Sequence, residues 1–275
     1  MKQNFLRNLM GGVILFALPL LLTSCEDIFG HWEKPIADVY TPTNFKVWNS
    51  TTQQWDKIDL SAYDFTKLTP ANVATLISGG ALTAGKYIVE GNVNYTGNVM
   101  VGGDAKLELY LQDDASFTIN GSLNASDLEG IEIHGQKDGT GKINITATGE
   151  GINSQSLTID GGKLTVEGGT GSDGGNGVVL NNGSGTLTVN GGDLSAKGHG
   201  EASNAVEGNL VFNNGRLVAI GGGTAPDING TWTLAKDTEL RNLTTGATAR
   251  ADGGVYTGPH RTSHDGVELR QYYYF

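Results

Sequence analysis

Short apolar segments alternate with polar residues along most of the chain, and an eleven-residue phrase recurs. Residues 156–166 read SLTIDGGKLTV, residues 186–196 read TLTVNGGDLSA, and residues 209–219 read NLVFNNGRLVA. With two looser copies, the leading apolar residues are Ile131, Leu157, Leu187, Leu210 and Trp232. These positions are 26, 30, 23 and 22 residues apart. A repeat of this length predicts a solenoid, in which each unit buries its apolar face only by stacking on its neighbours.

The corner between the two strands of each phrase bears on how the strands pair. Asp-Gly or Asn-Gly between short strands is also typical of β-hairpins, so an antiparallel β-sandwich is the alternative fold. The period favours a β-helix, because it accommodates three strands of three to five residues and three corners. Stacking would place Asp160, Asn190 and Asn213 about 4.8 Å apart in a hydrogen-bonded ladder. We expect Gly161 and Gly191 to take the positive φ of the corner. The prediction is an all-β protein, a right-handed parallel β-helix.

Alternation within the phrases also predicts which side chains point inward. They are Leu157, Ile159, Leu164, Val166, Leu187, Val189, Leu194, Ala196, Leu210, Phe212, Leu217 and Ala219. One short helix is expected over residues 69–77, with Thr69 as N-cap, Pro70 at the first helical position and a glycine pair as the stop. The predicted organisation is a signal peptide (1–24), a tether (25–44), an N-terminal cap (45–80), the β-helix (81–245) and a C-terminal cap (246–275).

The beginning of the chain resembles a lipoprotein signal peptide. Lys2 and Arg7 precede an apolar run at residues 12–22, which is too short to span a bilayer. The following Leu-Thr-Ser-Cys, ending at Cys25, resembles the lipobox of bacterial lipoproteins, in which the thiol accepts the lipid. The acidic pair after Cys25 resembles the export signal of some bacterial surface lipoproteins. We expect lipidation at Cys25 and anchoring in the cell envelope, at the outer membrane. The alternative is an ordinary secretory signal with an incidental cysteine.

Charge narrows the possible partners. The chain carries 18 basic and 29 acidic residues, for a net charge of −11. Without Lys2 and Arg7, 16 basic residues face 29 acidic ones, and the net charge becomes −13. A chain this acidic, with no basic cluster, argues against nucleic acid as the partner.

The run LTAGKYIVEG at residues 82–91, followed by the glycine-rich phrases, resembles the carbohydrate-binding parallel β-helix family of bacterial extracellular proteins. The similarity covers about residues 82–245. It implies a non-catalytic polysaccharide-binding protein, and some members of that family use calcium. No ligand-contacting residue of the family matches this chain one by one. A structural or adhesive surface protein is the second interpretation, and a polysaccharide lyase is the third.

The third side of each predicted coil varies most and carries candidate ligands. Stacking would place Glu150, Asp173, Glu201 and Asp227 along one edge, where carboxylates could bind calcium or a glycan. A solvated acidic edge is the alternative. Residues 168–173 match the start of the calcium-binding nonapeptide, but its apolar position is occupied by Gly175. His260 and His264 have a metal-ligand spacing only on a helix, and the surrounding glycines and proline indicate a loop.

Overall fold

The computed structural model describes residues 45–49, 54–57, 63–136, 139–169, 174–256 and 266–271. The expected signal peptide and tether lie outside this part of the chain. The same is true of Cys25, Asp173, the pair His260 and His264, and the aromatic residues 272–275. The predictions made for these residues therefore stay predictions.

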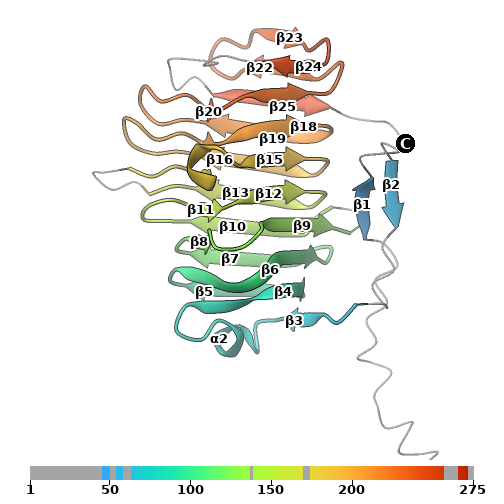
Figure 1. Cartoon of the computed structure of the whole chain (residues 1–275), viewed down its shortest axis with the longest axis vertical. Coiled ribbons are helices and arrows are strands. Elements are labelled where there is room, and N and C mark those ends of the chain that lie inside the picture. The colour runs from blue at the N-terminus through green and yellow to red at the C-terminus, as the bar shows by residue number, and fades with distance from the viewer. Residues whose placement is uncertain are drawn as a thin grey trace, which may run out of the picture. The chain divides into compact units, whose positions relative to one another are not determined.

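The described residues form a parallel β-helix whose successive coils stack strand upon strand (Figure 1). Each coil contributes to three faces. The first face contains Ala81–Thr83 of β4 and Val99–Val101 of β6, followed by β8 (Leu123–Ala125), β11 (Ile152–Ser154), β14 (Val178–Leu180), β17 (Val206–Glu207) and β20 (Ile228–Asn229). The second face contains Gly85–Val89 of β4 and Leu107–Leu111 of β6, followed by β9 (Ile131–Gly135), β12 (Ser156–Ile159), β15 (Thr186–Val189), β18 (Asn209–Phe212) and β21 (Trp232–Leu234). The third face contains β5 (Asn92–Thr96), β7 (Ser116–Asn120), β10 (Lys142–Thr146), β13 (Lys163–Glu167), β16 (Asp193–Lys197) and β19 (Gly215–Ile220).

The strand register confirms the repeat and excludes the antiparallel sandwich. Leu187 pairs with Leu157 on one side and with Leu210 on the other, and Leu210 pairs with Trp232. These pairs are parallel and reproduce the spacing of the phrases. All twelve side chains that were expected to point inward are at most 1% exposed. They form one continuous core, because each coil buries its apolar side chains against the coils above and below.

The predicted corner ladder is present. Asn190 Nδ2 donates to Asp160 Oδ1 at 2.8 Å, and Asn213 Nδ2 donates to Asn190 Oδ1 at 2.7 Å. Asp160 and Asn190 are buried, so these bonds satisfy polar groups that water reaches poorly.

The glycine that turns the corner is not the predicted one. Positive φ falls on Gly162 (+76°), Gly192 (+76°) and Gly215 (+97°), and not on Gly161 or Gly191. The reversal comes one residue later than expected, at the position where all three phrases have glycine. A Cβ at Gly192 would lie 2.5 Å from the carbonyl oxygen of Gly162 in the preceding coil. Both the turn and the close stacking therefore require glycine there.

The helix is shorter than predicted. It spans only Val73–Leu76 (α2), with Asn72 at the N-cap. The expected cap Thr69 is itself held by Asn72, whose Oδ1 accepts the Thr69 amide at 2.8 Å and its hydroxyl at 3.1 Å. Asn72 Nδ2 also donates to the Lys67 carbonyl at 2.8 Å. These side-chain bonds form a turn in place of the first helical turn.

The N-terminal part of the described chain adds two elements before the first coil. β3 (Thr66–Leu68) pairs in parallel with β4, and Leu68, Val73 and Ile77 are buried in the solenoid core. β1 (Lys46–Asn49) and β2 (Gln54–Lys57) form an antiparallel pair. Phe45, directly before β1, is fully buried, and its ring lies edge-on to Tyr110 of β6 at 5.5 Å between centroids.

Pairing changes direction at the C-terminal end. β22 (Glu239–Asn242), in the last part of the expected β-helix, does not stack on β19. Instead β25 (Val267–Gln271) lies between β19 and β22 and is antiparallel to both. β23 (Thr248–Arg250) and β24 (Gly254–Tyr256) are also antiparallel to their partners. Glu268 of β25 is 1% exposed, and its Oε1 accepts from Arg216 Nε and from Arg270 Nη2, each at 2.6 Å.

Candidate functional site

A polar hollow of about 290 Å³ lies on the outside of the first face. Val99, Leu123 and Ile152 point inward and are buried, so the alternate residues of the same strands point to solvent. Register places Asn124 directly beside Asn153 on adjacent coils. The lining residues are Asn98, Ser122, Asn124, Thr148, Gly149, Glu150 and Asn153.

Hydrogen bonds hold several of these side chains in place. Asn98 Oδ1 accepts the Ser122 amide at 3.0 Å, and Asn124 Oδ1 accepts the Ser126 amide at 3.0 Å. Asn153 Nδ2 donates to Glu150 Oε2 at 3.1 Å. Backbone N–H groups thus fix the amide oxygens of Asn98 and Asn124. The hollow therefore presents amides, hydroxyl groups and one carboxylate.

Glu150, Glu201 and Asp227 of the predicted acidic edge lie in corners between the third and the first face, but they differ in exposure. Glu150 is exposed and lines the hollow. Glu201 is exposed in a later corner, where its backbone carbonyl accepts the Thr224 amide at 3.0 Å. Asp227 is completely buried, and its Oδ1 accepts the Gly221 amide at 2.8 Å, which holds the last corner closed. Asp227 therefore does not belong to an accessible edge, since its carboxylate points into the corner.

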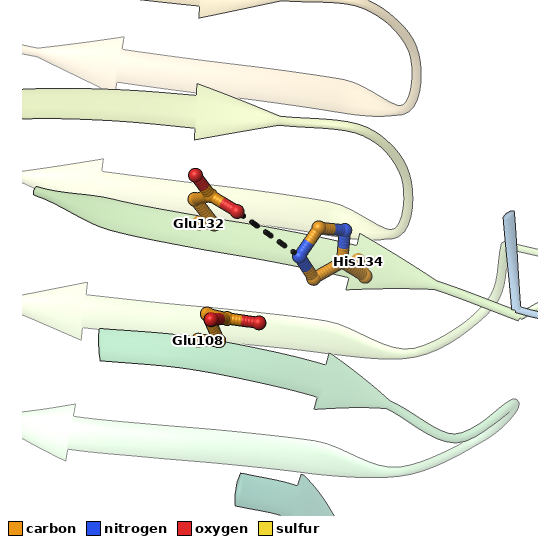
Figure 2. Close-up of side chains that lie close together, drawn as sticks. All are labelled: Glu108, Glu132 and His134. Carbon is orange, nitrogen blue, oxygen red and sulfur yellow. Dashed lines mark ion pairs between the residues drawn. The ribbon is translucent and has the colours of Figure 1, made fainter. Parts of the chain in front are cut away.

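A second polar cluster lies on the outer side of the second face, on β6 and β9. Register pairs Glu108 with Glu132 and Tyr110 with His134. Ligand atoms of Glu108, Glu132 and His134 all lie within 4.8 Å of one another. Figure 2 shows the His134 ring directed toward the Glu132 carboxylate, with Glu108 on the neighbouring strand. We call these three residues the Glu–Glu–His cluster.

Charged and aromatic groups surround the cluster. Lys86 contacts the Glu108 carboxylate, and Lys106 Nζ lies 2.6 Å from Glu132 Oε1. The Tyr110 hydroxyl donates to Glu108 Oε2 at 2.7 Å, and its ring stacks on His134 with 4.5 Å between centroids. Because Tyr110 is itself packed edge-on against aromatic rings, His134 is only 2% exposed although it lies on the outer side of the sheet.

These contacts shift the pKa values of the cluster. The His134 contact, together with Lys106, lowers the pKa of Glu132 to about 2 despite partial burial. Burial lowers the pKa of His134, but the carboxylates of Asp160 and Glu132 outweigh it, and the net pKa is raised. Burial, and then the hydrogen bond to Glu108, raise the pKa of Tyr110. Glu132 therefore stays ionised at neutral pH while Tyr110 stays protonated.

Sequence reasoning did not find His134, although the signal was present. The looser copy IEIHGQ, aligned with LTIDGG, places His134 at the corner position of Asp160. The ladder confirms this alignment, because His134 Nδ1 lies 3.2 Å from Asp160 Oδ2. The asparagines of the hollow were also missed. Asn124 and Asn153 share one outward position of the coil, but the coils on either side hold Met100 and Val179 there, so no asparagine repeat marks it.

Comparisons with known proteins add no family to this description. No protein-family model matches the chain, and neither a curated protein nor a solved structure does. Within the described residues, no helix is long and apolar enough to cross a membrane.

Proposed function

We propose that the protein is a lipid-anchored protein of the cell envelope whose β-helix binds polysaccharide without cleaving it. The hollow of the first face carries this proposal. Amides, hydroxyls and a carboxylate are the groups that hydrogen-bond the hydroxyls of a sugar. In the hollow, these groups are carried by strands of a packed sheet or by the corners next to those strands. The resemblance to carbohydrate-binding β-helices supports the same function.

The lining indicates the class of glycan. Glu150 is the single charged side chain among the residues that line the hollow. A uronate carboxylate would be repelled by Glu150, and no lysine or arginine of the lining would compensate. We therefore favour a neutral polysaccharide at this position. An acidic glycan would require a cation, and the predicted calcium ligand Asp173 is outside the described residues.

Affinity for one sugar should be low. No aromatic side chain is among the lining residues, so the stacking that usually dominates sugar binding is absent from the described hollow. A Kd near 1 mM, or about −4 kcal/mol, is the expected scale for such a polar site. A polymer that reaches several coils, or several anchored copies, gains from linked contacts. This suits a protein that holds a glycan at the cell surface.

Substitutions in the hollow test the proposal. Asn124→Ala and Glu150→Gln should each weaken binding to an array-identified glycan severalfold, measured by affinity electrophoresis or calorimetry. Asn229→Ala is the matched control, since Asn229 is exposed at the same outward position of the first face, three coils beyond Asn153. Equal binding by all three variants and the wild type would move the site elsewhere. Glycan-array silence would favour the adhesive alternative, and unsaturated products absorbing in the near ultraviolet would indicate a lyase.

Anchoring is tested separately at Cys25. Wild-type protein made in a bacterium should partition into detergent, and Cys25→Ala should stay in the aqueous phase with its signal peptide uncleaved. Wild-type protein that is soluble without detergent would refute lipidation and leave glycan binding untouched.

A further inference from the structure

The environment of His134 requires a positive centre beside Glu132. Nδ1 lies 3.2 Å from Asp160 Oδ2, and Nε2 lies 3.7 Å from Glu132 Oε2, yet neither nitrogen has a partner aligned for a hydrogen bond. If Nδ1 carries its proton toward Asp160, the Nε2 lone pair faces the lone pairs of the Glu132 carboxylate. Two lone pairs at this separation, in a site 2% exposed, repel each other unless a proton or a metal ion lies between them.

The geometry suits a metal ion better than a hydrogen bond. A separation of 3.7 Å between Nε2 and Oε2 is too long for an N–H···O bond, which has a usual range of about 2.7–3.2 Å. Two ligands of one tetrahedral ion, each about 2.0–2.2 Å from it, are separated by about 3.3–3.6 Å. The Glu108 carboxylate completes a set of three atoms within 4.8 Å, which an ion could draw together by small side-chain rotations.

The surrounding residues resemble the support that metal ligands need. A ligating histidine usually donates its other N–H to a carboxylate, and Asp160 occupies that place. Asp160 is itself fixed by Asn190 at 2.8 Å. The Tyr110 hydroxyl holds one oxygen of Glu108, which orients the other. These contacts come from four successive coils, so the ligands stand on a rigid sheet and not on a loop.

Two lysines would compete with a metal ion for the glutamates. Lys86 and Lys106 neutralise Glu108 and Glu132, and an ion must displace them. Their side chains are 28% and 39% exposed, so both ammonium groups can turn into solvent. We propose that the Glu–Glu–His cluster binds a divalent transition metal of the zinc class. The imidazole ligand argues against calcium, which takes six to eight oxygens.

Zinc titration of the full protein by calorimetry tests this proposal, with cobalt absorption as a second readout. One zinc ion should bind at this site. His134→Ala and Glu132→Gln should abolish it, and the positioning variant Asp160→Asn should weaken it by about 10- to 100-fold. A tetrahedral cobalt spectrum that disappears in His134→Ala identifies the ligand directly.

Histidines elsewhere provide the controls. His199→Ala removes a half-buried imidazole of a distant corner, and His260→Ala/His264→Ala removes the other spaced pair; both variants should bind zinc like the wild type. Glu108→Gln serves if His134→Ala fails to fold, because the Glu108 side chain is 17% exposed and that of His134 only 2%; it should weaken zinc binding at least tenfold. Wild-type protein that binds no zinc, or unchanged binding in Glu132→Gln and Glu108→Gln, would overturn the proposal in favour of a protonated His134.

Discussion

Truncating one inward leucine should reveal how the solenoid is held together. Leu187 is completely buried between Leu157 and Leu210, its register partners on the neighbouring coils. Leu187→Ala removes three carbons, which at about 0.8 kcal/mol each loses about 2.4 kcal/mol of burial. The hydrogen-bonded strands on both sides prevent collapse, so a cavity of roughly 60 Å³ should remain and add about 1.4 kcal/mol. The expected destabilisation is about 4 kcal/mol.

The measurement is thermal unfolding followed by circular dichroism. A loss of about 4 kcal/mol lowers the Tm of a domain this size by about 8–16 °C. Thr188→Ala is the matched control, because Thr188 is the next residue along β15 and points outward. It should cost at most about 1 kcal/mol. Amide exchange should rise in β12 and β18 as well as in β15, since each coil is stabilised by its neighbours. Equal Tm shifts for the two variants would refute the inward assignment and the register.

Two further predictions concern polar groups that the fold buries. Asn190→Ala leaves Asp160 and Asn213 without their ladder partner and should cost about 1–3 kcal/mol in urea unfolding, whereas the exposed Asn94→Ala should change stability by less than about 0.5 kcal/mol. Burial alone would raise the pKa of Glu268, but Arg270 and Arg216 lower it overall, so its contribution to stability is present above the ordinary pKa of 4.5 and is lost as the pH falls below that value. Glu268→Gln should therefore lower the Tm at neutral pH and flatten its decline in acid; a variant with the acid profile of the wild type would contradict this assignment.

Alternation and period were enough to predict the core of this protein. Both depend on short-range geometry, because a strand turns every second side chain inward and the repeat brings equivalent corners into register. Alternation alone contains no information on strand direction, and the period indicates it only where the phrase recurs. The sequence VELRQ of β25 alternates like any strand of the stack, yet it runs antiparallel between β19 and β22. It lies outside the recurring phrases, so the repeat did not predict its pairing.

The candidate site was harder to predict because it depends on residues that do not repeat. Glu150 was found from the variability of its corner. Asn124 and Asn153 share a register position in only two adjacent coils, and Asn98 lies outside that position. Asp227 shows the reverse problem. It stands in the expected corner, but the neighbouring glycine-rich turn leaves an amide unpaired unless a side chain reaches inward to accept it. The repeat predicts the corner in which Asp227 lies, but backbone hydrogen bonding determines the direction of its side chain.

The corner ladder also connects the fold to the Glu–Glu–His cluster. An asparagine both donates and accepts, so a ladder of asparagines can continue from coil to coil, and here each amide donates toward the preceding coil. Asp160 ends that series, because a carboxylate only accepts. The next ladder position therefore needs a donor, and His134 Nδ1 is the group that faces it. With Nδ1 facing Asp160, the Nε2 atom is the one that faces Glu132. The ladder has a carboxylate in place of an amide at Asp160, and this change determines that Nε2 is the imidazole nitrogen that would bind a metal ion.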